Sequence, residues 1–108
     1  MRAVIVGDRQ GDLQVRDIPG DLRNLQHLVG GYIECCAPAQ LRAKGIEMLA
    51  DEEGLLTGKP FNANLWPFFF VGDIVLVGVS GEDFVGLTDS QVDYINEWFK
   101  GLWEENDD

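Results

Sequence analysis

The strongest constraint on the fold is a helix start signal near the C-terminus. Thr88 and Gln91 have the spacing of a capping box, in which each side chain bonds the backbone N–H of the other residue. Leu87 precedes this box and is placed to pack on Val92 as a hydrophobic staple. A helix that begins here must lay an apolar face on another element. The end of the chain therefore predicts an amphipathic helix packed on a sheet.

The predicted helix has an apolar face and an acidic face. At about 100° per residue, large apolar side chains gather on one side and carboxylates on the opposite side. The apolar side has more aromatic area than a core contact requires, so we expect part of it to serve a partner protein or a homodimer. The apolar face comprises Val92, Ile95, Phe99, Leu102 and Trp103 with Tyr94 and Trp98 at its flank, and the acidic face comprises Asp89, Asp93, Glu97 and Glu104.

Ahead of this helix, short apolar runs separated by turn residues predict a sheet. The first two runs are expected to form a β-hairpin, and the runs on either side of the Asp51–Gly54 turn a second one. Between the hairpins, Asp21 is placed to cap a short helix that Gly30 and Gly31 end. The expected strands cover residues 3–6, 13–18, 32–36, 46–50, 55–56 and 74–79.

These elements predict an α+β fold in a single domain, residues 1–108. A chain of 108 residues suits one domain. The expected architecture is a small mixed, mainly antiparallel sheet, with a short helix after the first hairpin and the C-terminal amphipathic helix packed on it. Residues 57–67 are expected to form an ordered loop over the sheet, held by Phe61, Leu65 and Trp66, and residues 104–108 an acidic tail.

The net charge limits the classes of partner. With 8 basic and 19 acidic side chains the formal charge is −11, so direct binding to nucleic acid is disfavoured. Residues 55–108 carry 2 of the basic and 10 of the acidic groups. Asp89, Asp93 and Glu97 recur about every 6 Å along the predicted helix, close to the phosphate spacing of a DNA strand. This face is expected either to be a solvated surface or to mimic DNA.

No pattern in the sequence predicts a catalytic, cofactor or metal site. His27 is the only histidine, and a catalytic role would need Cys35 and carboxylates to converge on it. Cys35 and Cys36 are adjacent, which is not the spacing of zinc ligands. The Asp51–Gly54 turn lacks the alternating carboxylates of a calcium loop. We therefore expect no cofactor and no metal.

The sequence also carries no visible targeting signal. The apolar run after Met1 is shorter than the core of a signal peptide. The stretch from Leu65 to Val79 is interrupted by proline, glycine and aspartate, so we expect it to be core and not a membrane span. Two adjacent cysteines cannot join distant parts of the chain, which favours a reducing cytoplasm.

Four blocks of the sequence together resemble a known family. They lie at residues 25–34, 51–62, 72–78 and 81–89, and include Val-Gly-Gly-Tyr-Ile-Glu and Gly-Glu-Asp-Phe. Their order and content resemble the domain of unknown function 3846 family, small proteins of bacteriophages, plasmids and their bacterial hosts, over residues 22–95. Asp51 stands where the resemblance leads us to expect Asn, and the tryptophan-rich end lies outside it. If the blocks also form a surface, its polar members are Asp51, Glu52, Glu53, Asn62, Asn64, Glu82 and Asp83.

The resemblance implies a phage or mobile-element protein in the bacterial cytoplasm, and it supplies no catalytic residues. We expect a non-enzymatic accessory protein that binds a host or phage protein. The alternative is an acidic DNA mimic that inhibits a restriction enzyme or another nucleic-acid enzyme, and a second alternative is a small enzyme with an unrecognised site. The candidate partner-binding residues are Tyr94, Trp98, Trp103, Asp89, Asp93 and Glu97.

Overall fold

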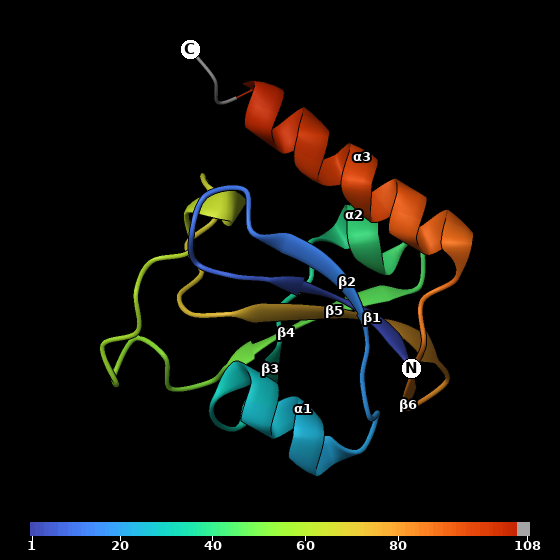
Figure 1. The fold of residues 1–108 in the computed structure, drawn as a ribbon, viewed down its shortest axis with the longest axis horizontal. Coiled ribbons are helices and arrows are strands. Elements are labelled where there is room, and N and C mark those ends of the chain that lie inside the picture. Colours follow the sequence, from blue (N-terminus) through green and yellow to red (C-terminus); the bar gives the residue numbers. More distant parts are fainter. Residues whose placement is uncertain (106–108) are drawn as a thin grey trace.

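One sheet lies between helices in the folded chain (Figure 1). The structure, a computed structural model, describes residues 1–105. Its strands are β1 (Arg2–Val6), β2 (Leu13–Asp17), β3 (Ile33–Cys35), β4 (Ile46–Asp51), β5 (Ile74–Ser80) and β6 (Asp83–Val85). Its helices are α1 (Leu22–Val29), α2 (Ala39–Arg42) and α3 (Asp89–Glu105), with one 3-10 turn, η1 (Ala63–Leu65). Helices α2 and α3 cover one face of the sheet and α1 covers the other (Figure 1).

The sheet has the strand order β2-β1-β5-β4-β3, and β6 pairs with the end of β5. The pairings between these strands are all antiparallel within residues 1–105, so the predicted α+β fold is confirmed. The first hairpin is also confirmed, with Val4 opposite Val15. Strand β5 lies at the centre, and its residues from Ile74 to Val77 are fully buried. Apolar residues at consecutive positions are typical of a strand that is covered on both faces.

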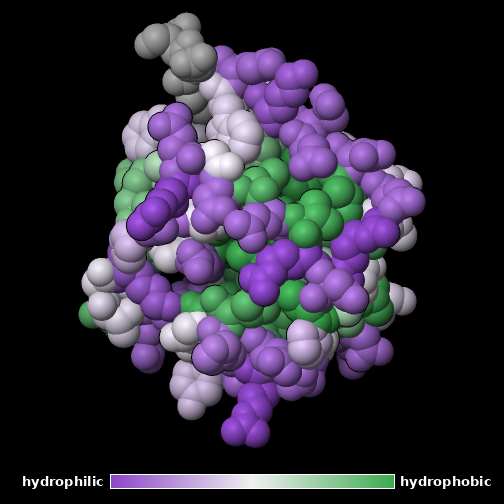
Figure 2. All heavy atoms as spheres, viewed as in Figure 1, coloured by the Kyte–Doolittle hydropathy of each residue, from purple (hydrophilic) through white to green (hydrophobic). Residues whose placement is uncertain are grey.

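The core consists of two clusters, one on each face of the sheet. Side chains alternate along a strand, so Ile74 and Leu76 of β5 point to one face while Val75 and Val77 point to the other. The first cluster contains Ile95 and Phe99 of α3 together with Leu41 of α2. The second contains Leu25 and Val29 of α1. Figure 2 shows hydrophilic residues over the outer surface of α3 and hydrophobic residues between this helix and the sheet.

The predicted ends of two helices are confirmed by their hydrogen bonds. The backbone N–H of Thr88 donates to Gln91 Oε1 at 3.0 Å, and the N–H of Gln91 donates to Thr88 Oγ1 at 3.2 Å. This reciprocal pair is the capping box, and Leu87 is buried beside it. At α1, Asp21 accepts from the N–H of Asn24, and Gly30 ends the helix at a φ of 82°, which favours glycine.

The predicted second hairpin is wrong, because Leu55 and Leu56 form no strand. They lie in consecutive turns and are 81% and 87% exposed. The Asp51 carboxylate accepts the N–H of Glu53 at 3.0 Å, and the N–H of Lys59 donates to the Gly54 carbonyl at 3.0 Å. These bonds fold the chain into turns directly after β4. The strands that pair with β4 are therefore β3 and β5.

Of the three side chains predicted to hold the long loop after these turns, only one is buried. Leu65 is fully buried, as expected, whereas Phe61 and Trp66 are exposed. The buried side-chain amides of Asn62 and Asn64 also hold the loop. The Asn62 amide donates to the carbonyls of Val6 at 3.2 Å and Gly72 at 2.9 Å, which fixes the loop between β1 and the start of β5.

The C-terminal helix extends further than the sequence predicted. Glu104 and Glu105, assigned to the acidic tail, belong to α3. The rest of the predicted tail, residues 106–108, lies outside the described residues. None of the helices that the structure describes is long and apolar enough to cross a membrane.

Candidate functional site

An exposed cluster of aromatic rings lies on the loop around η1. Phe61, Trp66 and Phe69 contact one another, with ring centroids 6.1 Å, 6.0 Å and 5.9 Å apart. Their exposed fractions are 41%, 49% and 81%, and Trp103 at the end of α3 is 37% exposed. We call Phe61, Trp66, Phe69 and Trp103 the aromatic surface. Side chains this large are usually buried, so their gathering at one place marks a candidate interaction site.

The aromatic surface is anchored to the body of the protein by Asn64. The Asn64 amide donates to the carbonyls of Gly7 at 2.7 Å and Arg9 at 2.6 Å, and its Oδ1 accepts the N–H of Gly11 at 2.6 Å. Its backbone carbonyl accepts the indole N–H of Trp103 at 2.9 Å. One buried residue thus joins the β1–β2 loop, η1 and the end of α3.

A hollow of about 560 Å³ opens between these three segments. Phe61, Trp66 and Trp103 give it aromatic walls, while Gln10, Gly11 and Glu104 complete its rim. The arrangement offers π faces beside a carboxylate, and nothing in it places a nucleophile against a base. It can bind a group by shape, stacking and charge.

The helix aromatics that the sequence singled out divide into two kinds. Trp98 is half-buried, stacks on Phe68 with centroids 6.0 Å apart, and meets Phe99 edge-on at 5.0 Å. Tyr94 is also half-buried, and Lys44 Nζ lies 5.3 Å from its ring centroid. Both side chains pack against the first core cluster. Of Tyr94, Trp98 and Trp103, only Trp103 belongs to the aromatic surface.

The exposed aromatic residues that the sequence analysis missed lie in the preceding loop. Phe61 and Trp66 were expected to hold that loop down, and Phe69 was not singled out. A signal was present, because the ten residues 61–70 contain five aromatic side chains without a period that would bury one face. Such density in a loop exceeds what the core beneath it can cover.

The acidic face of α3 is exposed as predicted, and one of its members is engaged. Asp89, Asp93 and Glu97 all face solvent. Arg2 Nη1 donates to the Asp89 carboxylate in an ion pair at the start of the helix. The charge of Asp89 is partly balanced by this contact, so Asp93 and Glu97 contribute most of the negative potential of the stripe.

The first two family-like blocks meet at the end of α1, around an ion pair. Lys59 Nζ lies 2.8 Å from Asp51 Oδ2 and also donates to the Val29 carbonyl. A side chain at Gly31 would lie 2.4 Å from the Asp51 carboxylate, and one at Gly30 would lie 2.5 Å from Lys59 Nζ. A side chain at either glycine would therefore displace a member of the ion pair, and Gly30 also has a φ of 82°, which favours glycine. Asp51, Asn62 and Asn64, named as possible surface residues, are buried instead.

His27 lines a second, shallow hollow beside this ion pair. The hollow has a volume of about 600 Å³, and Arg23, Tyr32, Glu53 and Thr57 also line it. The Thr57 hydroxyl donates to the backbone carbonyls of Glu53 and Gly54. Cys35 does not line the hollow. The constellation of His27, Cys35 and carboxylates that an enzyme would need is thus not assembled at this place.

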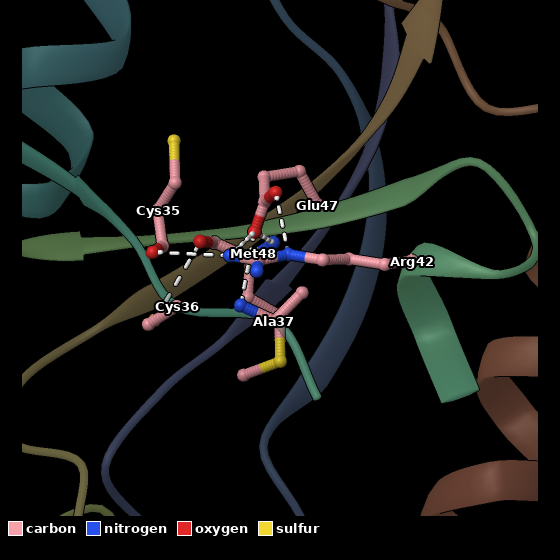
Figure 3. Close-up of polar contacts among 6 residues, drawn as sticks. All are labelled: Cys35, Cys36, Ala37, Arg42, Glu47 and Met48. Carbon is pink, nitrogen blue, oxygen red and sulfur yellow. Dashed lines mark hydrogen bonds and ion pairs between the residues drawn. The ribbon is translucent and has the colours of Figure 1, made fainter. Parts of the chain in front are cut away.

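The two cysteines lie next to a buried carboxylate that joins α2 to the sheet (Figure 3). Glu47 accepts the N–H groups of Ala37 at 2.9 Å and Met48 at 3.1 Å, and Arg42 Nε lies 3.1 Å from its carboxylate. The Cys35 sulfur points away from this carboxylate (Figure 3). Burial raises the pKa of Cys35, helped by the charge of Glu47. Burial, with Glu34 and Glu47 nearby, raises the pKa of Cys36 to about 12.

These pKa values predict unequal and slow alkylation of the two thiols. At about pH 8, iodoacetamide should modify Cys35 well before Cys36, because only the thiolate reacts and Cys36 is also half-buried. The measurement is the rate of mass gain in the single variants Cys35→Ser and Cys36→Ser. Equal rates in the two variants would contradict the assigned environments.

Carboxylates gather at one other place without forming a metal site. Partial burial and the charges of Asp8 and Asp12 raise the pKa of Asp73 near the β1–β2 loop. Across residues 1–105, no group of three or more histidine, cysteine, aspartate or glutamate side chains could hold a metal ion.

The fold and the site define a class: a small α+β protein whose antiparallel sheet is covered on both faces and whose exposed aromatic residues gather around one loop. Within that class, the chain belongs to the domain of unknown function 3846 family (DUF3846), whose profile matches residues 1–100. The match is wider than the resemblance over residues 22–95, since it includes the first hairpin and Trp98. Trp103 lies beyond it. No curated protein and no solved structure matches the chain significantly.

Proposed function

We propose that this protein is a non-catalytic accessory protein of phages or related mobile elements that binds another protein in the bacterial cytoplasm. The aromatic surface is the observation that carries the proposal. Exposed aromatic side chains form the energetic centres of protein interfaces, because they bury a large area and lose few rotamers. The genomic setting rests on the resemblance to phage and plasmid proteins.

The construction of the aromatic surface also supports a binding role. Phe61, Trp66 and Phe69 fix one another by ring contacts, and the Trp103 indole is fixed by its bond to the Asn64 carbonyl. Rings that are already held in place lose less conformational entropy on binding. The protein thus presents a surface that is prepared for binding.

Affinity capture from a lysate of the bacterial host tests the proposal. The double variant Trp66→Ala, Phe69→Ala should retain about one tenth of the partner that the wild-type protein captures, because truncating interface aromatics removes most of the binding energy. Tyr32→Ala is the matched control, since Tyr32 is 69% exposed but lies outside the aromatic surface. Undiminished capture by the double variant, at equal folded content, would refute the proposal.

The DNA-mimic alternative is supported by the exposed acidic face and is distinguished in the same experiment. Asp93→Asn with Glu97→Gln removes two charges from α3 and leaves the aromatic surface intact. If this variant loses the partner and the aromatic variant keeps it, a DNA mimic that occupies the basic cleft of a nucleic-acid enzyme explains the function better. The ion pair of Asp89 with Arg2 is the reason that we place this function second.

A further inference from the structure

The hollow beside η1 has a chemical character that narrows what it can bind. Its walls are the rings of Phe61, Trp66 and Trp103, and Glu104 is the one charged residue among the described residues that line it. Aromatic faces carry negative potential, so both the walls and the rim favour positive charge. An anionic group would meet the Glu104 carboxylate with no cation in the lining to offset it.

The walls are held at fixed positions before any ligand arrives. Trp103 is anchored by its indole N–H to Asn64, and Trp66 is held against Phe61 at 6.1 Å with their rings inclined by 71°. The Asn64 side chain fixes Gly11 at the opposite rim. A flat cation can therefore stack on an aromatic ring whose position is already fixed, and it loses little of the stacking and cation–π attraction to reordering of the site.

We propose that this hollow binds an arginine side chain carried by a basic segment of the partner protein, an inference that rests on the proposed function and specifies its ligand. The guanidinium stacks on the indole rings, and its N–H groups donate to the Glu104 carboxylate. Arginine suits the site better than lysine because its charge is planar and weakly hydrated.

The charge of the whole chain favours the same occupant. At a formal charge of −11 the protein attracts a basic segment over long range and repels both nucleic acid and a second copy of itself. The acidity lies mainly in the half of the sequence that contains the aromatic surface. The long-range attraction and the Glu104 carboxylate in the hollow thus favour a ligand of the same sign of charge.

The test uses a capped pentapeptide with one central arginine and its twin with citrulline, which keeps the shape and removes the charge. Each peptide is titrated into the full-length protein, and binding is followed by the NMR signals of the tryptophan indole N–H groups. The arginine peptide should shift the signals of Trp66 and Trp103 and leave that of Trp98 in place, and it should bind about tenfold more tightly than the citrulline peptide. Glu104→Gln should weaken arginine binding several-fold and leave citrulline binding unchanged.

Each outcome bears on the inference separately from the proposed function. Equal binding of the two peptides, or shifts confined to the residues around Asp93 and Glu97, would overturn arginine recognition at the hollow. If these results came with loss of host-protein capture in the Trp66→Ala, Phe69→Ala variant, the protein-binding function would stand and only the arginine ligand would fail. A homodimer in light scattering that this variant dissolves would overturn both.

Discussion

Replacing Lys59 with methionine should lower the free energy of unfolding by about 3 kcal/mol, because it leaves a buried carboxylate without its cation. Lys59 Nζ lies 2.8 Å from Asp51 Oδ2, and the Asp51 side chain is only 5% exposed. The same ammonium donates to the Val29 carbonyl at the end of α1. The variant thus loses an ion pair and a helix-end contact at once. Urea unfolding followed by circular dichroism measures the change.

The pH dependence of this loss identifies its electrostatic origin. Hydrogen bonds from Lys59 and from the N–H of Glu53 lower the pKa of Asp51 below its ordinary value of 3.8. A carboxyl with a lowered pKa stabilises the fold above its unfolded pKa, and this contribution is lost as the pH falls through the folded pKa. In the Lys59→Met variant the N–H of Glu53 alone still opposes the effect of burial, so the pKa of Asp51 is higher than in the wild type. The stability gap between variant and wild type should therefore narrow from about pH 7 to about pH 3.

Two further variants separate the ion pair from a general effect of removing a lysine. Lys100→Met is the matched control, because Lys100 is exposed on α3 and its loss should change stability by less than about 0.5 kcal/mol. Asp51→Asn in the Lys59→Met background removes the uncompensated charge and should recover part of the lost stability. A constant gap at every pH, or no recovery in the double variant, would contradict the assigned role.

Sequence patterns predicted the elements whose signals are local. The Thr88–Gln91 capping box and the Asp21 cap needed only neighbouring residues, and both helices begin where those signals place them. The apolar run at residues 74–79 predicted a strand, which is present as β5, and its place at the centre of the sheet came from the structure. Local bonding within one turn is nearly independent of the rest of the fold, so the sequence alone carries it.

The errors arose where distant residues decide the outcome. Leu55 and Leu56 resemble a strand, but the Asp51 carboxylate and Lys59 turn the chain before a strand can form. Asn62 and Asn64 look like loop surface, and only the carbonyls of β1 and its loop show that these amides are buried. The candidate site was also mispredicted in part because contacts between distant residues decide which aromatic side chains are covered. The α3 periodicity could place Tyr94 and Trp98 on its flank, but it could not reveal that Phe68 and Lys44 cover them.

The aromatic surface therefore depends on one buried amide, and replacing it is the second large effect that we expect. Asn64→Ala removes two donated bonds to Gly7 and Arg9 and one accepted from Gly11. Buried polar groups that lose their partners destabilise the fold, so the free energy of unfolding should fall by about 3 kcal/mol. Asn96→Ala is the matched control, since Asn96 is exposed on α3 and its replacement should change stability by less than about 0.5 kcal/mol.

The same variant should also disturb the site in the molecules that remain folded. Trp103 bonds the backbone carbonyl of residue 64, which alanine retains, but the β1–β2 loop is no longer tied to that residue. Hydrogen exchange should accelerate at Gly11 and at the Trp103 indole while the amides of β4 and β5 stay protected. Exchange that rose equally over the whole sheet would show that Asn64 supports the core in general. A rise confined to the two segments around the hollow would show that the amide positions the aromatic walls, because local opening then occurs without unfolding the sheet.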